Sequence, residues 1–210
     1  YYPDRILHHA IMNILEPIWV SVFTKDTYSC IKGRGIHGAM RNVKRAIKDR
    51  ENARYCLKID IRKFYPSIDH DVLKTIIRRK IKCKDTLALL DTIIDSTDGV
   101  PIGNYLSQYF ANLMLAYFDH WIKEEKRVRY YFRYADDMVF LASTKEELHI
   151  LLADIKKYLA ALKLTLKGNE QIFPIAENRA DKHGRGLDFV GFVFYHNQTL
   201  MRKSIKQNFC

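Results

Sequence analysis

The sequence has few of the residues that mark extended, cross-linked or membrane-spanning chains. Its 210 residues include only nine Gly and five Pro, which argues against a linker or a fibrous repeat. The four cysteines are scattered without a C-x-x-C pair, so we expect reduced thiols rather than a disulfide scaffold or a zinc site. No stretch approaches the roughly 20 apolar residues that a bilayer requires, and no export signal is visible. These absences predict a cytoplasmic protein without a membrane span.

Positive charge is what the sequence has in excess. There are 35 Lys and Arg residues against 24 Asp and Glu, a formal net charge of +11 with His neutral. A hydrophobic content of 48% supplies a core, which excludes a disordered basic tail and suggests one large domain or two closely packed ones. A field of this sign attracts polyanions, and nucleic acid or an anionic membrane surface are the candidates.

Hydrophobic periodicity and capping residues predict six helices. They are a helix over 6–15 that Pro17 ends or turns; one over 36–48 with a basic exposed side; one capped by Asp69 or Asp71; one starting at Asp85 or Thr86; a long one over about 104–126; and one starting at the Thr144-x-x-Glu147 capping box.

Segments rich in β-branched and aromatic residues predict the strands. They are 53–61, 128–134, 138–142, 164–166, 171–175 and 187–194. The second and third of these are separated only by Ala135-Asp136-Asp137, which indicates a hairpin with two carboxylates at its bend. We find no internal repeat and no linker that would mark a domain boundary.

Three aspartates occupy positions at which a charged side chain does not stabilise the fold. Asp136 and Asp137 are adjacent between apolar β segments, and neighbouring carboxylates repel each other when they are partly desolvated. A solvated turn would also accommodate the pair. Asp60 interrupts a third apolar strand, where its charge needs a compensating cation. Two Mg²⁺ ions about 4 Å apart would supply it and would clamp the oxygens of a phosphoryl transfer, which also explains the basic surface.

Four ordered motifs resemble those of reverse transcriptases. Tyr134-Ala135-Asp136-Asp137 is similar to the family's Y-x-D-D signature, and residues 58–65 (KIDIRKFY) resemble its first carboxylate motif. Residues 99–108 (GVPIGNYLSQ) resemble the loop-to-helix motif between them, and 189–192 (FVGF) the strand that grips the primer end. Together with a finger-like N-terminal segment, the resemblance covers essentially the whole chain.

The third motif narrows the resemblance. Most bacterial reverse transcriptases, including those of group II introns and retrons, carry Gln-Gly-x-x-x-Ser-Pro, whereas this chain has Ile102-Gly103-x-x-x-Ser107-Gln108. This pattern is similar to that of diversity-generating retroelement reverse transcriptases, which copy a template RNA with frequent errors at adenines. A group II intron-like enzyme is the alternative.

The resemblance implies an RNA-directed DNA polymerase, a nucleotidyltransferase that extends a primer 3′-hydroxyl with deoxynucleotides. Asp60 and Asp136 are expected to bridge two Mg²⁺ ions, with Mn²⁺ as a substitute, and Asp137 and the Ile61 carbonyl are further metal ligands. Tyr65 matches the steric gate that excludes a ribose 2′-hydroxyl, although a buried aromatic before Pro66 is the simpler explanation of it.

Further residues are assigned to the substrates by the same resemblance. The expected nucleotide-binding residues besides Tyr65 are Lys32 and Arg34 in the finger loop, Gly103 and Gln108 in the third motif, and Lys167. The expected primer grip consists of Val190, Gly191 and Phe192. A solvated basic loop would explain Lys32 and Arg34 equally simply, and Lys167 could be a solvated strand-end lysine.

The implied fold is α+β: right-hand polymerase fingers and palm, with an antiparallel palm sheet and packed helices. We expect fingers over 1–56, palm over 57–69, a fingers/palm insertion over 70–100, and palm over 101–210 that ends in the primer-grip strands, with the thumb absent. The expected partners are template RNA, a primer strand, deoxynucleoside triphosphates and, in this bacterial or phage-encoded subclass, a small basic accessory protein.

Three alternatives remain at this point. One is a group II intron-encoded reverse transcriptase or maturase. Another is a non-catalytic RNA-binding module that uses the same fold and charge, against which the intact Asp60, Asp136 and Asp137 argue. The third is a palm-type cyclase or nucleotidyltransferase that needs no template, but such proteins lack the finger loop, the aromatic gate and the grip motif.

Overall fold

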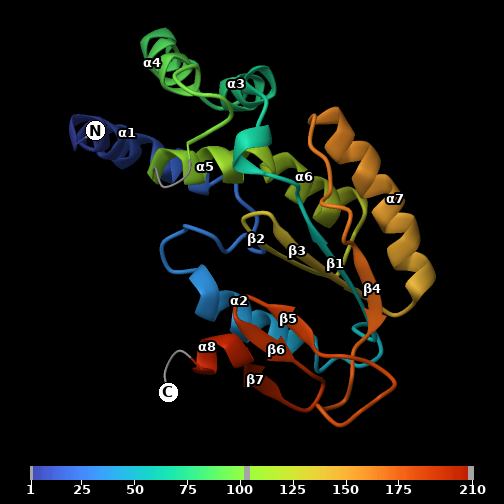
Figure 1. Ribbon diagram of the computed structural model, residues 1–210. Helices are drawn as coiled ribbons and strands as arrows, with labels where there is room; N and C mark the ends of the chain where they lie inside the picture. The colour runs from blue at the N-terminus through green and yellow to red at the C-terminus, as the bar shows by residue number, and fades with distance from the viewer. Residues whose placement is uncertain (1, 102–104, 208–210) are drawn as a thin grey trace.

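A four-stranded antiparallel sheet, here called the central sheet, lies at the middle of the molecule (Figure 1). The computed structural model describes residues 2–101 and 105–207. The central sheet has the order β2-β3-β1-β4, and a second, small sheet has the order β5-β6-β7. Their strands are β1 (Tyr55–Asp60), β2 (Tyr130–Tyr134), β3 (Asp137–Ala142), β4 (Gln171–Pro174), β5 (Leu187–Phe189), β6 (Phe192–Phe194) and β7 (Thr199–Met201).

Helices cover both sheets. Within the described residues they are α1 (Tyr2–Val20), α2 (Gly35–Ala46), the 3₁₀ turn η1 (Tyr65–Ser67), α3 (His70–Arg78), α4 (Lys84–Ile94), α5 (Tyr105–Met114), α6 (Ala116–His120), the π-helical turn η2 (Trp121–Glu125), α7 (Lys145–Ala161) and α8 (Lys203–Gln207). Figure 1 shows α1, α3, α4 and α5 above the central sheet, α7 along one side, and α2 with the small sheet below. None of these helices is long and apolar enough to cross a membrane.

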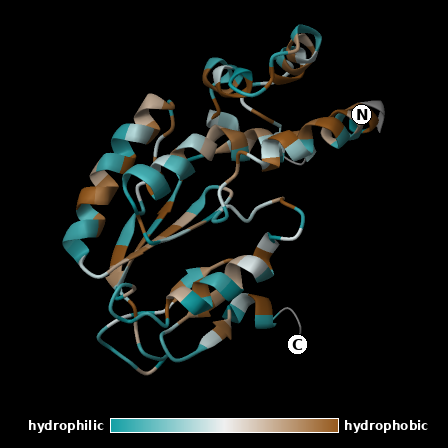
Figure 2. Cartoon of the chain, turned by 180° about the vertical axis from the view of Figure 1, so that it is seen from behind, coloured by the Kyte–Doolittle hydropathy of each residue, from teal (hydrophilic) through white to brown (hydrophobic). Residues whose placement is uncertain are grey.

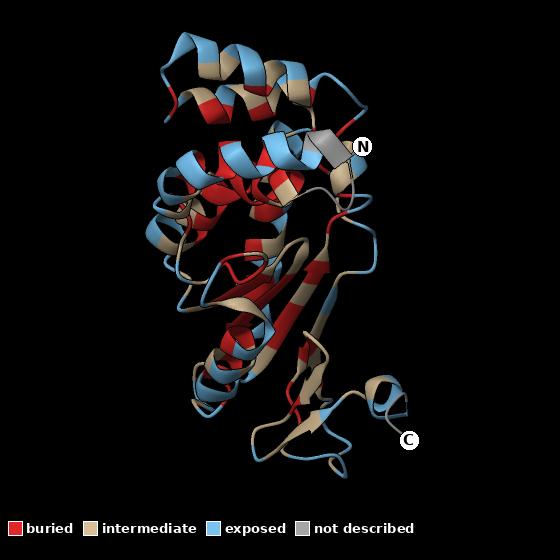
Figure 3. Ribbon diagram, turned by 90° about the vertical axis from the view of Figure 1, so that its left-hand side faces the viewer, coloured by how far each residue is buried: buried red, intermediate tan, exposed pale blue. Residues whose placement is uncertain are grey.

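Strand alternation divides the apolar side chains of the central sheet between two cores. Leu57 and Ile59 belong to the larger core, which includes residues of α1, α5, α6 and α7. Cys56 and Val139 point to the opposite face and belong to the core that includes residues of α2 and the small sheet. The strands are therefore buried on both faces over their middle residues, as the red segments in Figure 3 show. Helix α7, which covers one of these faces, alternates polar and apolar residues along its length (Figure 2).

Several predicted elements are confirmed, together with the helix caps and the strand pairing that were predicted for them. Asp69 caps α3 by accepting a hydrogen bond from the Val72 amide at 3.0 Å. Thr144 caps α7 by accepting one from the Glu147 amide at 3.3 Å. The predicted hairpin is present as β2 and β3, with Tyr134 opposite Asp137 in the register. Local capping and pleat rules therefore determine these elements.

Three expectations were wrong in detail. α1 continues past Pro17 to Val20, because Asn13 and Pro17 are exposed and water can bind the carbonyl that the proline leaves unpaired. The expected strand over 187–194 is two strands, since Val190 and Gly191 have φ values of 46° and 86° and form a tight hairpin turn. The expected segment 164–166 contributes only a single bridge, Leu166 with Ile61.

The expected long helix over about 104–126 is present in three pieces, α5, α6 and η2. Its expected first residue, Asn104, lies outside the described residues. Leu115 interrupts the helix with φ −105° and ψ 1°, and neither Gly nor Pro marks the break in the sequence. Asn112 before the break and Asp119 after it both reach the same buried side chain, Arg133.

Arg133 of β2 is buried completely and forms a two-point ion pair with Asp119 of α6. Its Nε donates to Oδ1 at 2.8 Å and its Nη2 to Oδ2 at 2.6 Å, and both side chains have no exposed surface. The hydroxyls of Tyr131 and Thr27 donate to the same carboxylate at 2.6 and 2.8 Å. Every lone-pair direction of the buried anion is thus satisfied, which a charge in this position requires.

We predict that replacing Asp119 by Ala destabilises the protein by about 3–5 kcal/mol, because Arg133 would be left buried without a counter-ion. The matched control is Asp154→Ala, which breaks the solvent-screened Lys126–Asp154 pair and should change the stability far less. Urea unfolding of both variants measures the difference. Equal losses in the two variants would contradict the structural importance of the buried pair.

Candidate active site

Two turns bring the three predicted aspartates together at one end of the central sheet. Asp60, the last residue of β1, is the register partner of Asp137, the first residue of β3. Ala135 lies in the β2–β3 turn, immediately before Asp136 and Asp137. Its φ of 54° is a left-handed conformation that allows the chain to reverse within two residues. The carboxylate of Asp136 lies within hydrogen-bonding reach of Asp60. The structure therefore places all three carboxyl groups beside one another.

Burial raises the pKa values of two of these carboxyl groups, those of Asp136 and Asp137. Desolvation raises the pKa of Asp137 from 3.8 to about 6, although the nearby Lys58 ammonium acts in the opposite direction. Desolvation also raises the pKa of Asp136, and the negative charge of Asp60 adds to the effect. A site that holds anions in this way has an electrostatic reason to bind a cation.

Two lysines partly compensate the carboxylates. The Nζ atom of Lys58 lies 3.2 Å from Asp137 Oδ2, and that of Lys167 lies 3.2 Å from Asp60 Oδ2. Lys167 is held in place by its own backbone, because its amide donates to the Asp60 carbonyl at 2.9 Å. Asp137 Oδ1 is nonetheless buried and has no hydrogen-bond partner among the residues that the structure describes. An unpaired buried carboxylate oxygen is costly unless a ligand or ion satisfies it.

The donor set fits Mg²⁺ in its chemistry. Carboxylate oxygens are the hard ligands that Mg²⁺ prefers, and this ion is commonly bound through one or two carboxylates. Asp60 and Asp136 form such a pair, and the unpaired oxygen of Asp137 lies next to them. No group of three His, Cys, Asp or Glu side chains in the described residues is gathered tightly enough to form a metal cage by itself. The pair Asp60 and Asp136 is therefore the candidate ligand set, and the role of the Ile61 carbonyl stays a prediction.

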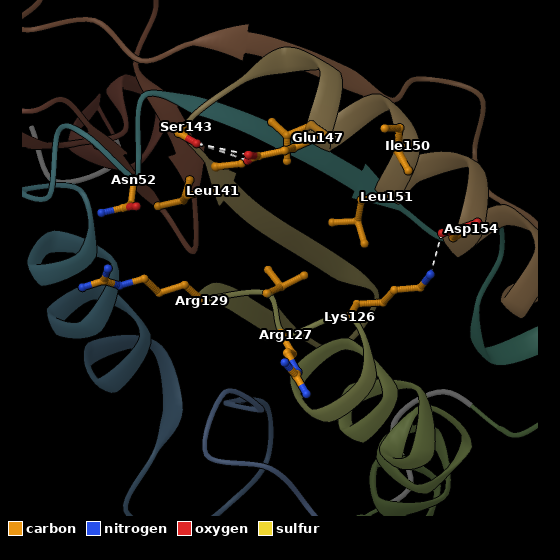
Figure 4. Close-up of a pocket in the computed structure, with 13 residues that line it drawn as sticks. Asn52, Lys126, Arg127, Arg129, Leu141, Ser143, Glu147, Ile150, Leu151 and Asp154 are labelled. Carbon is orange, nitrogen blue, oxygen red and sulfur yellow. Dashed lines mark hydrogen bonds and ion pairs between the residues drawn. The ribbon is translucent and has the colours of Figure 1, made fainter.

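A polar cavity of about 340 Å³ opens beside the carboxylates, between the central and small sheets. It is lined by Lys58, Ile59, Asp60, Asp137, Asn169, Gln171, Phe173, Arg185, Gly186 and Asp188. A larger cavity of about 460 Å³ lies at the opposite end of the β2–β3 hairpin, where Leu141, Leu151 and Arg129 border it (Figure 4). The larger hollow is thus remote from the carboxylates, so we place the chemistry at the smaller one.

Tyr65 begins the η1 turn, five residues after Asp60. Its pKa is raised chiefly by burial, and Cys30 and Asp136 contribute in the same direction. Gly99 fixes the backbone of this residue, because a Cβ atom at Gly99 would lie 2.5 Å from the Tyr65 carbonyl oxygen. The Val100 amide donates to the same carbonyl at 3.0 Å. Gly99 and Val100 therefore hold the Tyr65 turn in place.

The other predicted nucleotide-binding residues differ in their exposure and in their contacts. Lys32 is exposed beside α1, whereas the Arg34 guanidinium donates to the backbone carbonyls of Thr24 and Thr27. Arg34 therefore braces the finger loop from within in this conformation. Gln108 is half-buried in α5, and Gly103 lies outside the described residues.

The predicted grip residues form the β5–β6 turn. Val190 and Gly191 occupy the turn, and Phe192 begins β6. Lys58 links this small sheet to the carboxylates, since its Nζ donates to the Asp188 carbonyl at 2.6 Å while pairing with Asp137. The sequence motifs assign Lys58 no role of its own, although its period-two spacing from Asp60 is the signal that both side chains face the same side of the sheet.

We predict that Asp137→Asn stabilises the free protein by about 1–2 kcal/mol at pH 8. The folded-state pKa of about 6 exceeds the usual 3.8, so the folded protein binds this proton more tightly than the unfolded chain does. Stability therefore decreases as the pH rises from about 4 to about 6 and stays reduced above that range. Urea unfolding at pH 8 and pH 4.5 tests this: the gain should shrink at the lower pH, and a loss at pH 8 would refute it.

Comparison with known proteins agrees with this geometry. Residues 2–169 match the family model of the reverse transcriptase (RNA-dependent DNA polymerase). Protein YkfC of Escherichia coli (strain K12) is 24% identical over 96% of this chain and 62% of its own length. The group II intron-encoded protein LtrA of Lactococcus lactis is 26% identical over 60% of this chain and 22% of its own length. The chain thus spans less than two thirds of these relatives.

The fold is shared with solved structures of very different sequence. Apo telomerase of Candida tropicalis, truncated from its C-terminal domain, superimposes with a TM-score of 0.71 at 14% identity over 92% of this chain and 45% of that one. The fold is accordingly that of right-hand polymerases, with mixed helices and antiparallel sheet in the arrangement of fingers and palm. Because the family model covers most of the sequence, this chain belongs to the reverse transcriptase (RNA-dependent DNA polymerase) family.

Proposed function

We propose that this chain catalyses RNA-directed DNA synthesis, adding deoxynucleotides to a primer 3′-hydroxyl on an RNA template. The observation that carries the proposal is the convergence of Asp60, Asp136 and Asp137 at one end of the central sheet in a chain of this family. The raised pKa values of Asp136 and Asp137, together with the unpaired Asp137 oxygen, support a site that binds cations.

In this proposal Asp60 and Asp136 would hold two Mg²⁺ ions, or Mn²⁺ in their place, and the bound metal would supply the positive charge that favours ionisation of the primer hydroxyl and stabilises the pyrophosphate. Lys167, already paired with Asp60, carries a positive charge and a proton at the edge of the same site. Lys32 at the surface of the finger loop attracts the triphosphate, while Arg34 keeps that loop folded. The β5–β6 turn supports the primer end.

The proposed function also implies boundaries between the fingers and the palm. We assign residues 1–56 to the fingers, 57–69 to the palm, 70–100 to a fingers/palm insertion and 101–210 to the palm and primer grip. Template RNA and primer are bound between these parts. The strong exposed basic charge predicts that RNA affinity decreases steeply with salt.

Asp136→Asn should abolish primer extension on an RNA template with Mg²⁺, because the substitution removes a carboxylate charge from the metal pair while keeping the side-chain shape. Asp154→Asn on the outer surface is the matched control and should leave extension unchanged. Extension is followed with a labelled primer on a denaturing gel. Equal extension by wild type and Asp136→Asn would refute catalysis at this site and would favour an RNA-binding module.

Replacing Tyr65 by Ala should admit ribonucleotides, since the ring near Asp136 occupies space next to the incoming sugar in this proposal. The measurement is the ratio of extension rates with ribonucleotides and deoxynucleotides. Tyr65→Phe is the control, because it retains the ring and should retain the discrimination. Unchanged discrimination in Tyr65→Ala would show that Tyr65 is a packing residue.

Within the family we assign the chain to error-prone retroelements of the diversity-generating kind, on Ile102 and Gln108 of the third motif. A small basic accessory protein is the partner that this subclass would add. The similarity to LtrA supports the second candidate, a group II intron-encoded reverse transcriptase or maturase. Sequencing of the products distinguishes them: we expect errors concentrated at template adenines, whereas ordinary fidelity there would favour the intron-like candidate.

A further inference from the structure

His70, the first residue of α3, joins two segments that lie far from it in the sequence. Its Nε2 atom lies 2.8 Å from the carbonyl oxygen of Gly99, and its Nδ1 atom lies 3.3 Å from Asp95 Oδ1. A carbonyl oxygen can only accept a hydrogen bond, so Nε2 is the donor to Gly99. The side chain is 25% exposed, and the contact is therefore partly shielded from water.

Gly99 is at the same time packed against the turn that carries Tyr65. A Cβ atom at Gly99 would lie 2.5 Å from the Tyr65 carbonyl oxygen and 2.6 Å from that of Pro66. The amide of the next residue, the buried Val100, donates to the Tyr65 carbonyl at 3.0 Å. The Gly99–Val100 segment is therefore held both by the His70 ring and by the backbone of the Tyr65 turn.

Asp95 and Lys74 fix the orientation of the His70 ring. Asp95 follows the last residue of α4, and its Oδ1 also pairs with Lys74 Nζ at 2.6 Å. The two helices α3 and α4 lie above α5 in Figure 1, and the contact between His70 and Asp95 joins the start of one to the end of the other. With both ring nitrogens engaged, the donor to Gly99 has a defined direction.

We propose that His70 is a positioning residue for sugar selection. Its hydrogen bond to the Gly99 carbonyl holds the Tyr65 turn in the place from which the aromatic ring meets the incoming nucleotide. His70 acts through the backbone of Gly99 and Val100 rather than by contact with a substrate. The inference rests on the proposed function in taking Tyr65 as the residue next to the sugar.

The Tyr65 side chain has a second support of its own. The ring is half-buried and packs edge-to-face on the buried Phe64, with 5.7 Å between the ring centroids. This contact restrains the rotation of the ring, whereas the contacts of Gly99 and Val100 restrain the backbone that carries it. Loss of the His70 hydrogen bond should therefore weaken sugar discrimination without abolishing it.

The test uses three single substitutions in α3. His70→Leu removes the donor, whereas His70→Gln keeps an N–H group at about the distance of Nε2 from the backbone. Lys74→Gln is the matched control, because it breaks the ion pair with Asp95 and leaves the donor to Gly99 in place. The measurement is the ratio of primer-extension rates with deoxynucleotides and ribonucleotides. His70→Leu should lower this ratio roughly 3- to 10-fold, the net effect of one hydrogen bond, and the other two variants should match wild type.

Hydrogen exchange of the Val100 amide gives a readout that needs neither metal nor substrate. This amide is the donor to the Tyr65 carbonyl, so loosening of the segment should speed its exchange in His70→Leu by a similar factor. His70→Gln should restore the slow exchange. Urea unfolding of each variant shows whether a change in global stability accounts for the difference.

An unchanged sugar ratio in a His70→Leu protein that extends primers would overturn the inference and leave the proposed function intact. An equal loss in Lys74→Gln would also overturn it, because closure of the α3–α4 pair would then explain the effect. If wild type fails to extend a primer, the proposed function is wrong and amide exchange decides the inference. Faster Val100 exchange in His70→Leu with rescue by His70→Gln then supports the positioning of the Tyr65 turn, and unchanged exchange overturns it.

Discussion

The buried ion pair between Arg133 and Asp119 is the contact on which the rest of the structure depends. It joins β2 to α6, and through Thr27 it also fastens the segment that leads into the finger loop. The same guanidinium donates to the carbonyl of Ala135 at 3.1 Å, in the turn that carries Asp136 and leads into Asp137. One desolvated side chain therefore fixes the fingers, the helix layer and the position of Asp136 together. A buried charge can do this only because its partners satisfy it completely.

The carboxyl groups of Asp136 and Asp137, unlike the Arg133–Asp119 pair, are only partly compensated. Asp136 and Asp137 are held in a partly desolvated position that raises their pKa values, and the adjacent Lys58 and Lys167 offset this only in part. Such groups reduce the stability of the free protein, which is common where a site is shaped for a ligand. The fully satisfied Arg133 network beneath them supplies the rigidity that keeps these strained groups in place.

The sequence was sufficient to predict the capped helices α3 and α7, the β2–β3 hairpin and the convergence of the three aspartates, because capping, strand alternation and ordered motifs are short-range signals. It could not predict that Arg133 would be buried, since an arginine in a strand looks like any solvated cation until its partner, Asp119, is placed beside it by tertiary packing. The break at Leu115 was missed for the same reason. Arg34 was expected to face the triphosphate, but which way a long side chain points depends on carbonyls that only the folded loop presents.

The contact between Gly99 and the Tyr65 turn has a consequence for how this protein can vary. Any side chain at Gly99 would collide with the backbone at Tyr65 and Pro66, and the left-handed φ of 61° adds strain of its own. The Tyr65–Pro66 turn and the Gly99–Val100 segment consequently cannot shift independently of each other. A substitution that displaces one of these two backbone segments must be accommodated by the other, although they lie more than thirty residues apart in the sequence.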